Sequence, residues 1–310
     1  VRRPAAHGTL HPGMLGKHPM SGRFAPSPTG DLHVGNLRTA LLAWLMARAS
    51  GRRFVVRMED LDRVTSSPDI AGRQLADLAA LGIDWDGPVE FQSTRFDRYQ
   101  LAIERLAAQG LVYPCYCTRR EIQAEVAAAS SAPHTMPGAY PGTCRDLTPA
   151  ERDERAASGR PAALRLRTDG ATIEFSDVLA GSFAGPVDDV VLARADGVPA
   201  YNLAVVVDDA EQGIDQVVRG DDLLDSTPRQ ILLQRLLGYP QPDYAHVPLV
   251  VDNDGARLAK RHTAITLDDL SARGWSAGRV TAALARSLGI EVDGVVRAGE
   301  LVDRFDPGRV

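Results

Sequence analysis

Apolar side chains first become regular after residue 33, where they repeat with helical spacing and lead into a short uninterrupted apolar run. The helix expected over 36–50 has one apolar face, formed by Leu37, Ala40, Leu41 and Trp44. After Gly51, the run at 54–58 is typical of a buried strand, and another strand is expected to lead into the loop at His33. Strand, helix and strand in this order predict a βαβ unit with parallel pairing and a right-handed crossover.

Helical periodicity continues beyond this unit, and two amphipathic helices are expected near 67–82 and 93–109. The pattern changes character at residue 111. A charged helix near 148–158 and alternating strands such as 163–167 are expected there. We therefore interpret 111–190 as an insertion between two halves of a sheet domain.

A hairpin-like pattern marks the return to the sheet domain. Residues 190–194 and 201–207 are rich in valine and leucine, and a turn is expected between them at 196–197. Asp208 and Asp209 follow the second run. We interpret them as solvated turn acids in preference to a catalytic pair.

The composition is that of an ordinary globular protein, with 310 residues, 44% of them hydrophobic and 24% charged. The formal net charge of −5 excludes a global basic field, so any RNA contact would depend on local arginines. No apolar run reaches the roughly 18 residues that span a bilayer. Residues 1–19 lack the apolar core of a signal peptide, so a flexible extension and a cytoplasmic protein without a membrane partner are expected.

The segment 23–36 combines a strand end, a proline-stiffened turn, a small loop and a helix start. Prolines flank Ser27, while Gly30 and Gly35 allow a ligand to approach the backbone. The free N–H groups and the dipole of a helix start suit an anion. His33 could donate a hydrogen bond to a phosphate, or it could be a structural loop residue. The segment as a whole predicts a nucleotide site.

Lysine is rare in this chain. It occurs only at Lys17 and Lys260, and every other basic residue is arginine. Lys260 lies in the stretch 257–261, shortly after a glycine-bearing turn at 252–255. A compact ammonium on a flexible stem suits a loop that holds phosphates, and a surface lysine is the alternative.

Three cysteines form an odd set that no intrachain disulfide pattern can exhaust. Cys115 and Cys117 are separated by one residue, and Cys144 follows a turn. A closed structural zinc site needs four ligands, so a fourth donor is required, and His134 is the more usual type of ligand near this set. The alternative is three inert buried cysteines.

Together, the motifs at 33–36 and 258–261 resemble the paired signatures of class I aminoacyl-tRNA synthetases. Four further segments resemble the glutamate-specific branch, in the expected order and at natural spacings, and these are 23–30, 57–60, 201–204 and 219–222. The resemblance covers residues 22–265. Several short motifs in a fixed order are far more specific than any one of them.

This resemblance implies an α/β fold, namely a Rossmann-like parallel sheet domain of the class I synthetase type, an inserted zinc-bearing α+β subdomain and a short helical C-terminal region. The corresponding divisions are a flexible extension at 1–20, the first half of the catalytic domain at 21–110, the insertion at 111–190, the second half with the lysine loop at 191–265, and the helical region at 266–310.

The resemblance also implies roles for individual residues. Catalysis would rest on His33 and Lys260, and ATP with its Mg2+ would contact His33, Gly35, Asn36 and Lys260. Glutamate would be bound by Arg23, Phe24, Ala25, Pro26, Ser27, Glu59, Tyr201 and Arg219. Tyr140 would be the fourth ligand of one Zn2+ per chain, with Cys115, Cys117 and Cys144. Ala259 stands where the family often has serine, so one hydroxyl contact is lost.

The expected acceptor follows from what lies after the lysine motif. A full glutamyl-tRNA synthetase would carry a large anticodon-binding region there, whereas only residues 266–310 follow in this chain. The sequence therefore resembles the shorter branch of the family, in which a monomer attaches glutamate to the queuosine base of tRNA(Asp). Acylation of an ordinary tRNA 3′ end is the alternative within the family. A small-molecule nucleotidylyltransferase or a non-catalytic RNA-binding module is the alternative outside it.

Overall fold

The computed structural model describes residues 20–129, 140–250 and 265–309. Its main feature is a seven-stranded sheet with the strand order β3-β2-β1-β9-β10-β6-β7. β1 (Ser21–Phe24) lies between β2 (Arg53–Met58) and β9 (Ile214–Gly220) and pairs in parallel with both. β10 (Asp243–Val247) continues the parallel set, and β3 (Glu90–Phe91) is its other edge. The predicted α/β class and the parallel βαβ unit are confirmed.

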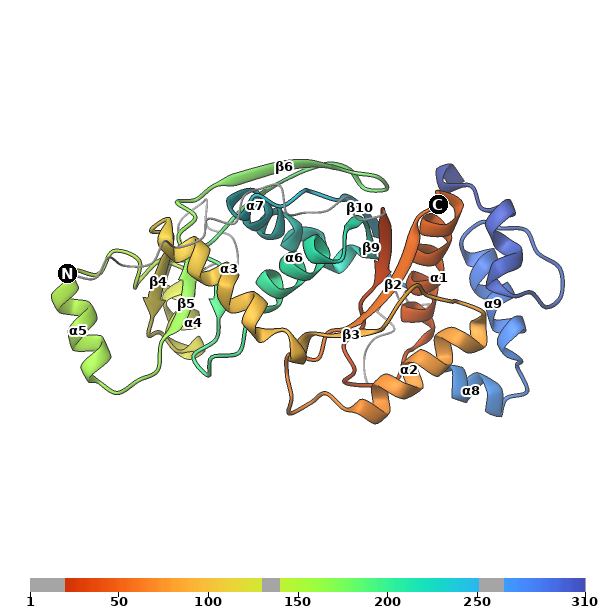
Figure 1. The fold of residues 1–310 in the computed structure, drawn as a ribbon, viewed down its shortest axis with the longest axis horizontal. Helices are drawn as coiled ribbons and strands as arrows, with labels where there is room; N and C mark the ends of the chain where they lie inside the picture. Colours follow the sequence, from red (N-terminus) through yellow and green to blue (C-terminus); the bar gives the residue numbers. More distant parts are fainter. Residues whose placement is uncertain (1–19, 130–139, 251–264, 310) are drawn as a thin grey trace, which may run out of the picture.

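The crossover helix α1 (Val34–Ala49) lies within one residue or two of the predicted range and is more deeply buried than its pattern suggested. Every side chain from Ala40 to Ala47 is buried, so the helix is enclosed on all sides over two turns. One side packs on β1 and β9. The other packs on α9 (Ala277–Ser287), which lies to the right of α1 in Figure 1, and on the 3₁₀ helix η4 (Ala298–Arg304).

The remaining predicted helices of this half are also present. α2 (Pro68–Leu81) ends at Gly82, which adopts the left-handed conformation typical of a helix C-terminus. α3 (Phe96–Ala108) follows the short 3₁₀ helix η2 (Gln92–Thr94). The C-terminal region begins with α8 (Leu267–Ala272) and ends with the 3₁₀ helix η5 (Pro307–Arg309), in agreement with the helical prediction for 266–310.

The second face of the main sheet is covered by α3, by α6 (Tyr201–Glu211) and by α7 (Thr227–Leu237), which follows the 3₁₀ helix η3 (Asp221–Ser226). The prediction of a strand over 201–207 is therefore wrong. Side chains from Leu203 to Ala210 are all buried, so the segment shows neither a helical nor an alternating pattern, and its valines favoured a strand locally. Asp208 and Asp209 are buried in this helix and are not solvated turn acids.

The stretch 111–190 contributes to two sheets. β4 (Val112–Cys115) and β5 (Ala163–Leu166) form a small antiparallel sheet with β8 (Val191–Ala193). The hairpin of β6 (Thr172–Asp177) and β7 (Gly181–Pro186) instead extends the main sheet beside β10. α4 (Arg119–Ala129), which the sequence pattern did not predict, and the predicted α5 (Pro149–Ala157) complete this part, seen on the left in Figure 1.

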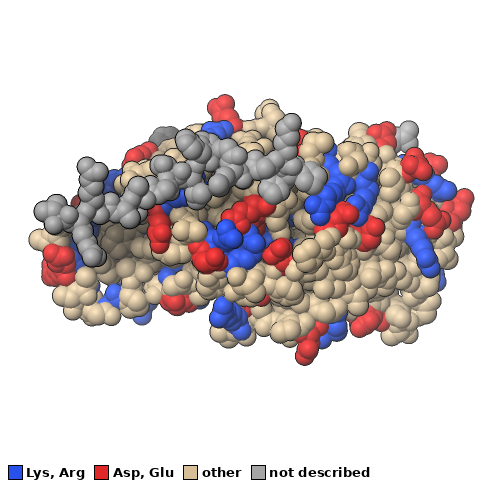
Figure 2. All heavy atoms as spheres, viewed as in Figure 1, with Lys and Arg blue, Asp and Glu red and all other residues tan. Residues whose placement is uncertain are grey.

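The surface carries charges of both signs. On the face shown in Figure 2, acidic and basic side chains alternate without a large region of one sign. An RNA contact on this face would therefore depend on a few arginines, and its affinity would fall as salt increases. Among the described helices, none combines the length and the apolar character needed to cross a bilayer.

Candidate active site

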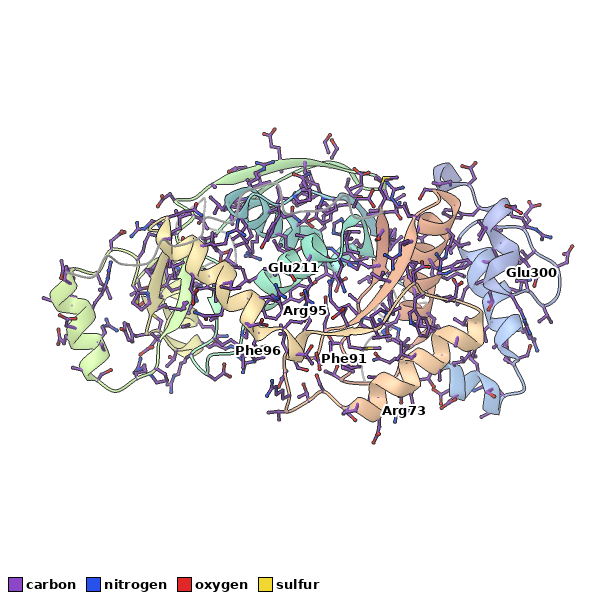
Figure 3. The ribbon with its side chains drawn as sticks, viewed as in Figure 1. Arg73, Phe91, Arg95, Phe96, Glu211 and Glu300 are labelled. Atoms are coloured by element: carbon purple, nitrogen blue, oxygen red, sulfur yellow. The ribbon has the colours of Figure 1, made fainter. Side chains whose placement is uncertain are left out.

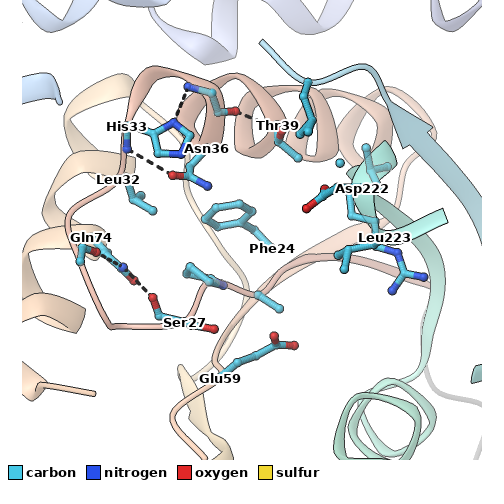
Figure 4. Close-up of a pocket in the computed structure, with 18 of the residues that line it drawn as sticks. Phe24, Ser27, Leu32, His33, Asn36, Thr39, Glu59, Gln74, Asp222 and Leu223 are labelled. Atoms are coloured by element: carbon cyan, nitrogen blue, oxygen red, sulfur yellow. Dashed lines mark hydrogen bonds between the residues drawn. The ribbon is translucent and has the colours of Figure 1, made fainter. Parts of the chain in front are cut away.

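A cavity of about 730 Å³ opens at the carboxyl ends of β1, β2 and β9, next to the start of α1 (Figure 4). This edge of a parallel sheet is where open α/β folds bind ligands. The described residues that the sequence assigned to ATP or glutamate all line it: Arg23, Phe24, Ala25, Pro26, Ser27, His33, Gly35, Asn36, Glu59, Tyr201 and Arg219.

His33 is the N-cap of α1. Its Nδ1 accepts a 3.1 Å hydrogen bond from the N–H of Gly35, and its own N–H donates to Asn36 Oδ1 at 3.2 Å. Because Nδ1 accepts, the neutral ring carries its proton on Nε2. A Cβ on Gly35 would lie 2.9 Å from the His33 ring, so a side chain at this position would displace the ring. The arrangement fixes a ring donor beside the positive end of the helix dipole.

The loop before His33 is held from α2 by Gln74, which sequence reasoning missed. Its amide donates to Ser27 O at 3.1 Å and to Gly30 O at 2.7 Å (Figure 4). Glu59 N donates to Pro26 O at 2.9 Å and ties the same loop to the end of β2. The backbone between Pro26 and Gly30 is thereby fixed at the cavity wall.

The floor of the cavity holds a buried carboxylate between arginines. Burial raises the pKa of Glu59, and this effect is opposed by the charges of Arg57 and Arg23. Arg57 lies 3.4 Å from Glu59 Oε1, and Arg23 donates to Val218 O at 3.3 Å. Burial also raises the pKa of Tyr201, and the Glu59 charge raises it further. A positive group in this part of the cavity would meet Glu59, and a negative one would meet Arg23.

Arg57 belongs to a buried ion-pair network beneath the cavity. It donates to Asp209 Oδ1 at 2.8 Å, and its Nε lies 3.7 Å from Asp208. Arg95, at the start of α3, donates a 2.8 Å hydrogen bond to Asp208. It also donates to Glu211, at the end of α6, at 2.6 Å (Figure 3). Burial alone would lower the pKa of Arg57, but these carboxylates raise it. Asp208 and Asp209 therefore hold the arginines of the site in place.

Arg219 lies at the end of β9 and is buried except where it lines the cavity. It donates through Nε to His246 Nε2 at 3.0 Å, through Nη1 to Gln230 Oε1 at 2.8 Å and through Nη2 to Thr227 Oγ1 at 2.8 Å. Gln230 also donates to Asn202 Oδ1 at 3.1 Å. These partners were not predicted.

Lys260, Ala259 and the rest of 251–264 lie outside the described residues, as do His134 and residues 1–19. The two neighbours of the lysine segment are described. Val250 lines the cavity, and Ile265 O accepts a 2.9 Å hydrogen bond from Val34 N at the start of α1. The described residues on both sides of the lysine segment therefore lie at or beside the cavity.

A second group of candidate functional side chains lies at the end of β4 in the small sheet and in the turn beside it. The Sγ atoms of Cys115, Cys117 and Cys144 are all within 4.8 Å of one another, so these residues can hold a metal ion. Tyr140 Oη lies 3.3 Å from Cys115 Sγ and 3.9 Å from Cys117 Sγ. Burial and the hydrogen bond with Cys144 raise the pKa of the Cys117 thiol to about 12. The predicted set is brought together on β4 and its neighbouring turn, and its thiols fit a soft or borderline cation.

Comparison with known proteins agrees with this geometry. Residues 19–301 match the family described as tRNA synthetases class I (E and Q), catalytic domain. A Nocardia farcinica protein named glutamyl-Q tRNA(Asp) synthetase is 63% identical over 290 residues, which cover 94% of this chain and 90% of that protein. A Symbiobacterium thermophilum protein of the same name is 50% identical, with 94% of each chain covered.

Solved structures show the same fold. The crystal structure of glutamate-tRNA synthetase from Elizabethkingia anophelis superposes with a TM-score of 0.80 at 26% identity. The match covers 94% of this chain and 66% of that one, so the chain spans slightly less than two thirds of the solved structure. A methionyl-tRNA synthetase from Mycobacterium tuberculosis shares the fold at a TM-score of 0.51 and 11% identity.

Proposed function

Because the chain belongs to the family of class I tRNA synthetases for glutamate and glutamine, we propose that it is a ligase that activates L-glutamate with ATP and transfers the glutamyl group to the queuosine base in the anticodon loop of tRNA(Asp). The observation that carries this proposal is the cavity itself. It places a helix N-terminus capped by His33 opposite a buried set of glutamate-binding candidates, Arg23, Glu59, Tyr201 and Arg219.

The first step joins glutamate to AMP. An α-carboxylate oxygen of glutamate attacks the α-phosphorus of ATP, the bond from that phosphorus to the bridging oxygen breaks, and pyrophosphate leaves with the electron pair. Positioning and charge neutralisation supply most of the catalysis in such a reaction. We assign the ring of His33 and the helix start at Gly35 and Asn36, with its dipole, to the phosphates, and the ammonium of Lys260 to the charge that moves onto pyrophosphate. The ATP substrate would carry Mg2+, which would neutralise part of the phosphate charge.

Glutamate recognition follows from charge. Glu59 suits the α-ammonium, and the arginines Arg23 and Arg219 suit the carboxylates. Tyr201 and the backbone of 24–27 complete the wall of the cavity. Arginine forms stronger, charge-assisted hydrogen bonds with a carboxylate than with a neutral amide, so glutamine should bind less tightly than glutamate.

The cysteine set serves the fold of its own region. We assign Zn2+ to Cys115, Cys117, Cys144 and Tyr140, which supply the four ligands of a closed structural site. The ion would tie the turn at 140–144 to the end of β4. It would supply folding energy and take no part in glutamate activation.

The acceptor is the second half of the proposal. Eight curated relatives that are 45–63% identical over most of the chain share the name glutamyl-Q tRNA(Asp) synthetase. The cyclopentene diol of queuosine offers a vicinal hydroxyl pair similar to that of a terminal ribose, and an unpaired loop base can reach a protein pocket. The names of these relatives do not favour acylation of a tRNA 3′ end. Cytoplasmic location, a monomeric state and the domain boundaries stay predictions.

Glutamate-dependent exchange of pyrophosphate into ATP tests the activation step. We expect exchange with L-glutamate in the complete absence of RNA, and much weaker exchange with L-glutamine. Exchange that requires tRNA, or that proceeds equally well with glutamine, would contradict the proposal.

A further inference from the structure

Arg219 is held by three buried acceptors, one for each nitrogen of its guanidinium, and they are His246, Gln230 and Thr227. A guanidinium has five N–H donors, so each terminal nitrogen has one more hydrogen beyond these bonds. Arg219 also lines the cavity. The orientation in which it meets a carboxylate is therefore set by its buried partners.

The bond from Arg219 to His246 fixes the tautomer of the imidazole. Arginine stays protonated in proteins, so its Nε–H donates and His246 Nε2 must accept. The ring is then neutral and carries its proton on Nδ1, which donates to Asp177 Oδ2 at 2.6 Å. Burial and the nearby Arg219 charge lower the pKa of His246, in agreement with a neutral ring.

Asp177 has only one oxygen to offer to the ring. Its Oδ1 already accepts three backbone N–H groups, from His246 at 3.1 Å, from Leu179 at 3.0 Å and from Ala180 at 2.8 Å. The last two belong to the turn between β6 and β7. Asp177 therefore joins the hairpin to β10 and at the same time points Oδ2 at the imidazole.

The surrounding charges are consistent with this arrangement. The neutral ring lies between the negative Asp177 on β6 and the positive Arg219 on β9, and the charge of Arg23 on β1 is also felt there. The phenol ring of Tyr244 stacks on the imidazole at a centroid distance of 6.0 Å. All of these groups are buried apart from the sides of Arg219 and Arg23 that line the cavity, so water cannot easily replace a lost partner of the imidazole.

We propose that Asp177 and His246 are positioning residues that aim Arg219 at a carboxylate of glutamate, with Asp177 selecting the tautomer that accepts from the arginine. This inference rests on the proposed function, because it requires Arg219 to bind glutamate. Neither residue touches the substrate. Their effect is on how firmly glutamate is held.

An Asp177→Asn variant separates this role from a structural one. The single amide oxygen must replace Oδ1, because three backbone N–H groups point at it. The amide NH2 then faces Nδ1 and forces the ring proton onto Nε2, where it opposes the N–H of Arg219. A turn residue without a positioning role would tolerate this change, since the three backbone hydrogen bonds to Oδ1 are kept.

The first test is a double-mutant cycle in pyrophosphate exchange. Asp177→Asn should raise KM for glutamate about 10-fold or more, the loss expected when a hydrogen bond to a charged group is misaligned, and leave KM for ATP unchanged. In a His246→Gln background, which has no tautomer to switch, Asp177→Asn should add little. Asp243→Asn, an exposed position on β10, is the matched control. An equal rise in both backgrounds, or no rise at all, would overturn the inference.

The second test needs no substrate. Nitrogen NMR of histidine-labelled protein should find the proton of His246 on Nδ1 in the wild type and on Nε2 in Asp177→Asn. A wild-type ring protonated on Nε2 would overturn the inference even if the enzyme were active. Absence of glutamate-dependent exchange in the wild type would overturn the proposed function, and the NMR result would still decide the tautomer.

Discussion

His33 and Thr266 pair as an isolated antiparallel bridge, so the chain that follows the lysine segment returns to the N-terminus of α1. The adjacent hydrogen bond from Val34 N to Ile265 O reinforces this junction. On the other side of the segment, Val250 lines the cavity. Both described neighbours of the segment that carries Lys260 thus lie at the proposed phosphate site.

Lys260→Ala should slow glutamate-dependent pyrophosphate exchange by about 2 to 4 kcal/mol of barrier, the range lost with one donor to a developing negative charge. Lys260→Arg should recover only part of the rate, since a planar fork cannot occupy the position of a point charge. Lys17→Ala, at the only other lysine, is the matched control and should exchange at the wild-type rate. An unchanged rate in Lys260→Ala would remove the role assigned to this residue.

Glutamate binding should weaken in acid because of Glu59. Burial raises its pKa, so the carboxylate that attracts the α-ammonium becomes neutral at a higher pH than an exposed glutamate would. KM for glutamate should therefore increase as the pH is lowered from neutral, while KM for ATP changes less. Glu59→Gln should bind glutamate weakly at neutral pH and show a smaller change with pH. An identical pH profile in the wild type and the variant would contradict this assignment.

Asp208→Ala should destabilise the fold. Asp208 is completely buried and accepts hydrogen bonds from Arg95, Tyr99 and Gln92, so its removal takes one counter-charge from Arg57 and Arg95 and leaves the buried donors of Tyr99 and Gln92 without this acceptor. Loss of one partner of a buried pair costs about 3–5 kcal/mol. Urea unfolding should show this loss, whereas the exposed Asp225→Ala should change stability by less than about 0.5 kcal/mol. Equal stability of the two variants would mean that the network contributes nothing.

Metal analysis should find about one zinc per chain, as a closed Cys3Tyr site requires. Cys115→Ser should lose the metal and increase hydrogen exchange around β4 and residues 140–145, with little effect on pyrophosphate exchange. His134→Ala should keep its zinc, and Tyr140→Phe should hold it less tightly. Zinc lost in His134→Ala but kept in Tyr140→Phe would reverse the choice of fourth ligand.

The elements predicted correctly are those whose sequence signals are local. The periodicity before Ser50 and the glycine at 51 define α1 and the start of β2, and the spacing of Cys115 and Cys117 indicated a cysteine cluster that could hold a metal ion. The helix α6 was missed because it is buried on all sides. In such a helix, the sequence shows neither the helical spacing of apolar residues nor the alternation of a half-buried strand, and a run of valines favours a strand.

Long-range polar partners could not be predicted from spacing. Asp208 binds Arg95, which lies 113 residues away in the chain. His246 binds Asp177, which lies 69 residues away. The sequence did contain one signal for such a partner. Gln74 is a polar residue on the buried face of α2, together with Ala71, Leu78 and Leu81. A polar residue on a buried helical face needs a hydrogen-bonding partner, and here the partner is the backbone of the nucleotide loop.

The most direct measurement of the central claim is transfer of labelled glutamate to purified tRNA. Three acceptors with intact 3′ ends should be compared: tRNA(Asp) that contains queuosine, the same tRNA(Asp) without queuosine, and tRNA(Glu). We predict stable labelling of the first alone, after activation that needs no RNA. Labelling of tRNA(Glu), with none of the queuosine-containing tRNA(Asp), would contradict the account and assign the chain to 3′-end acylation.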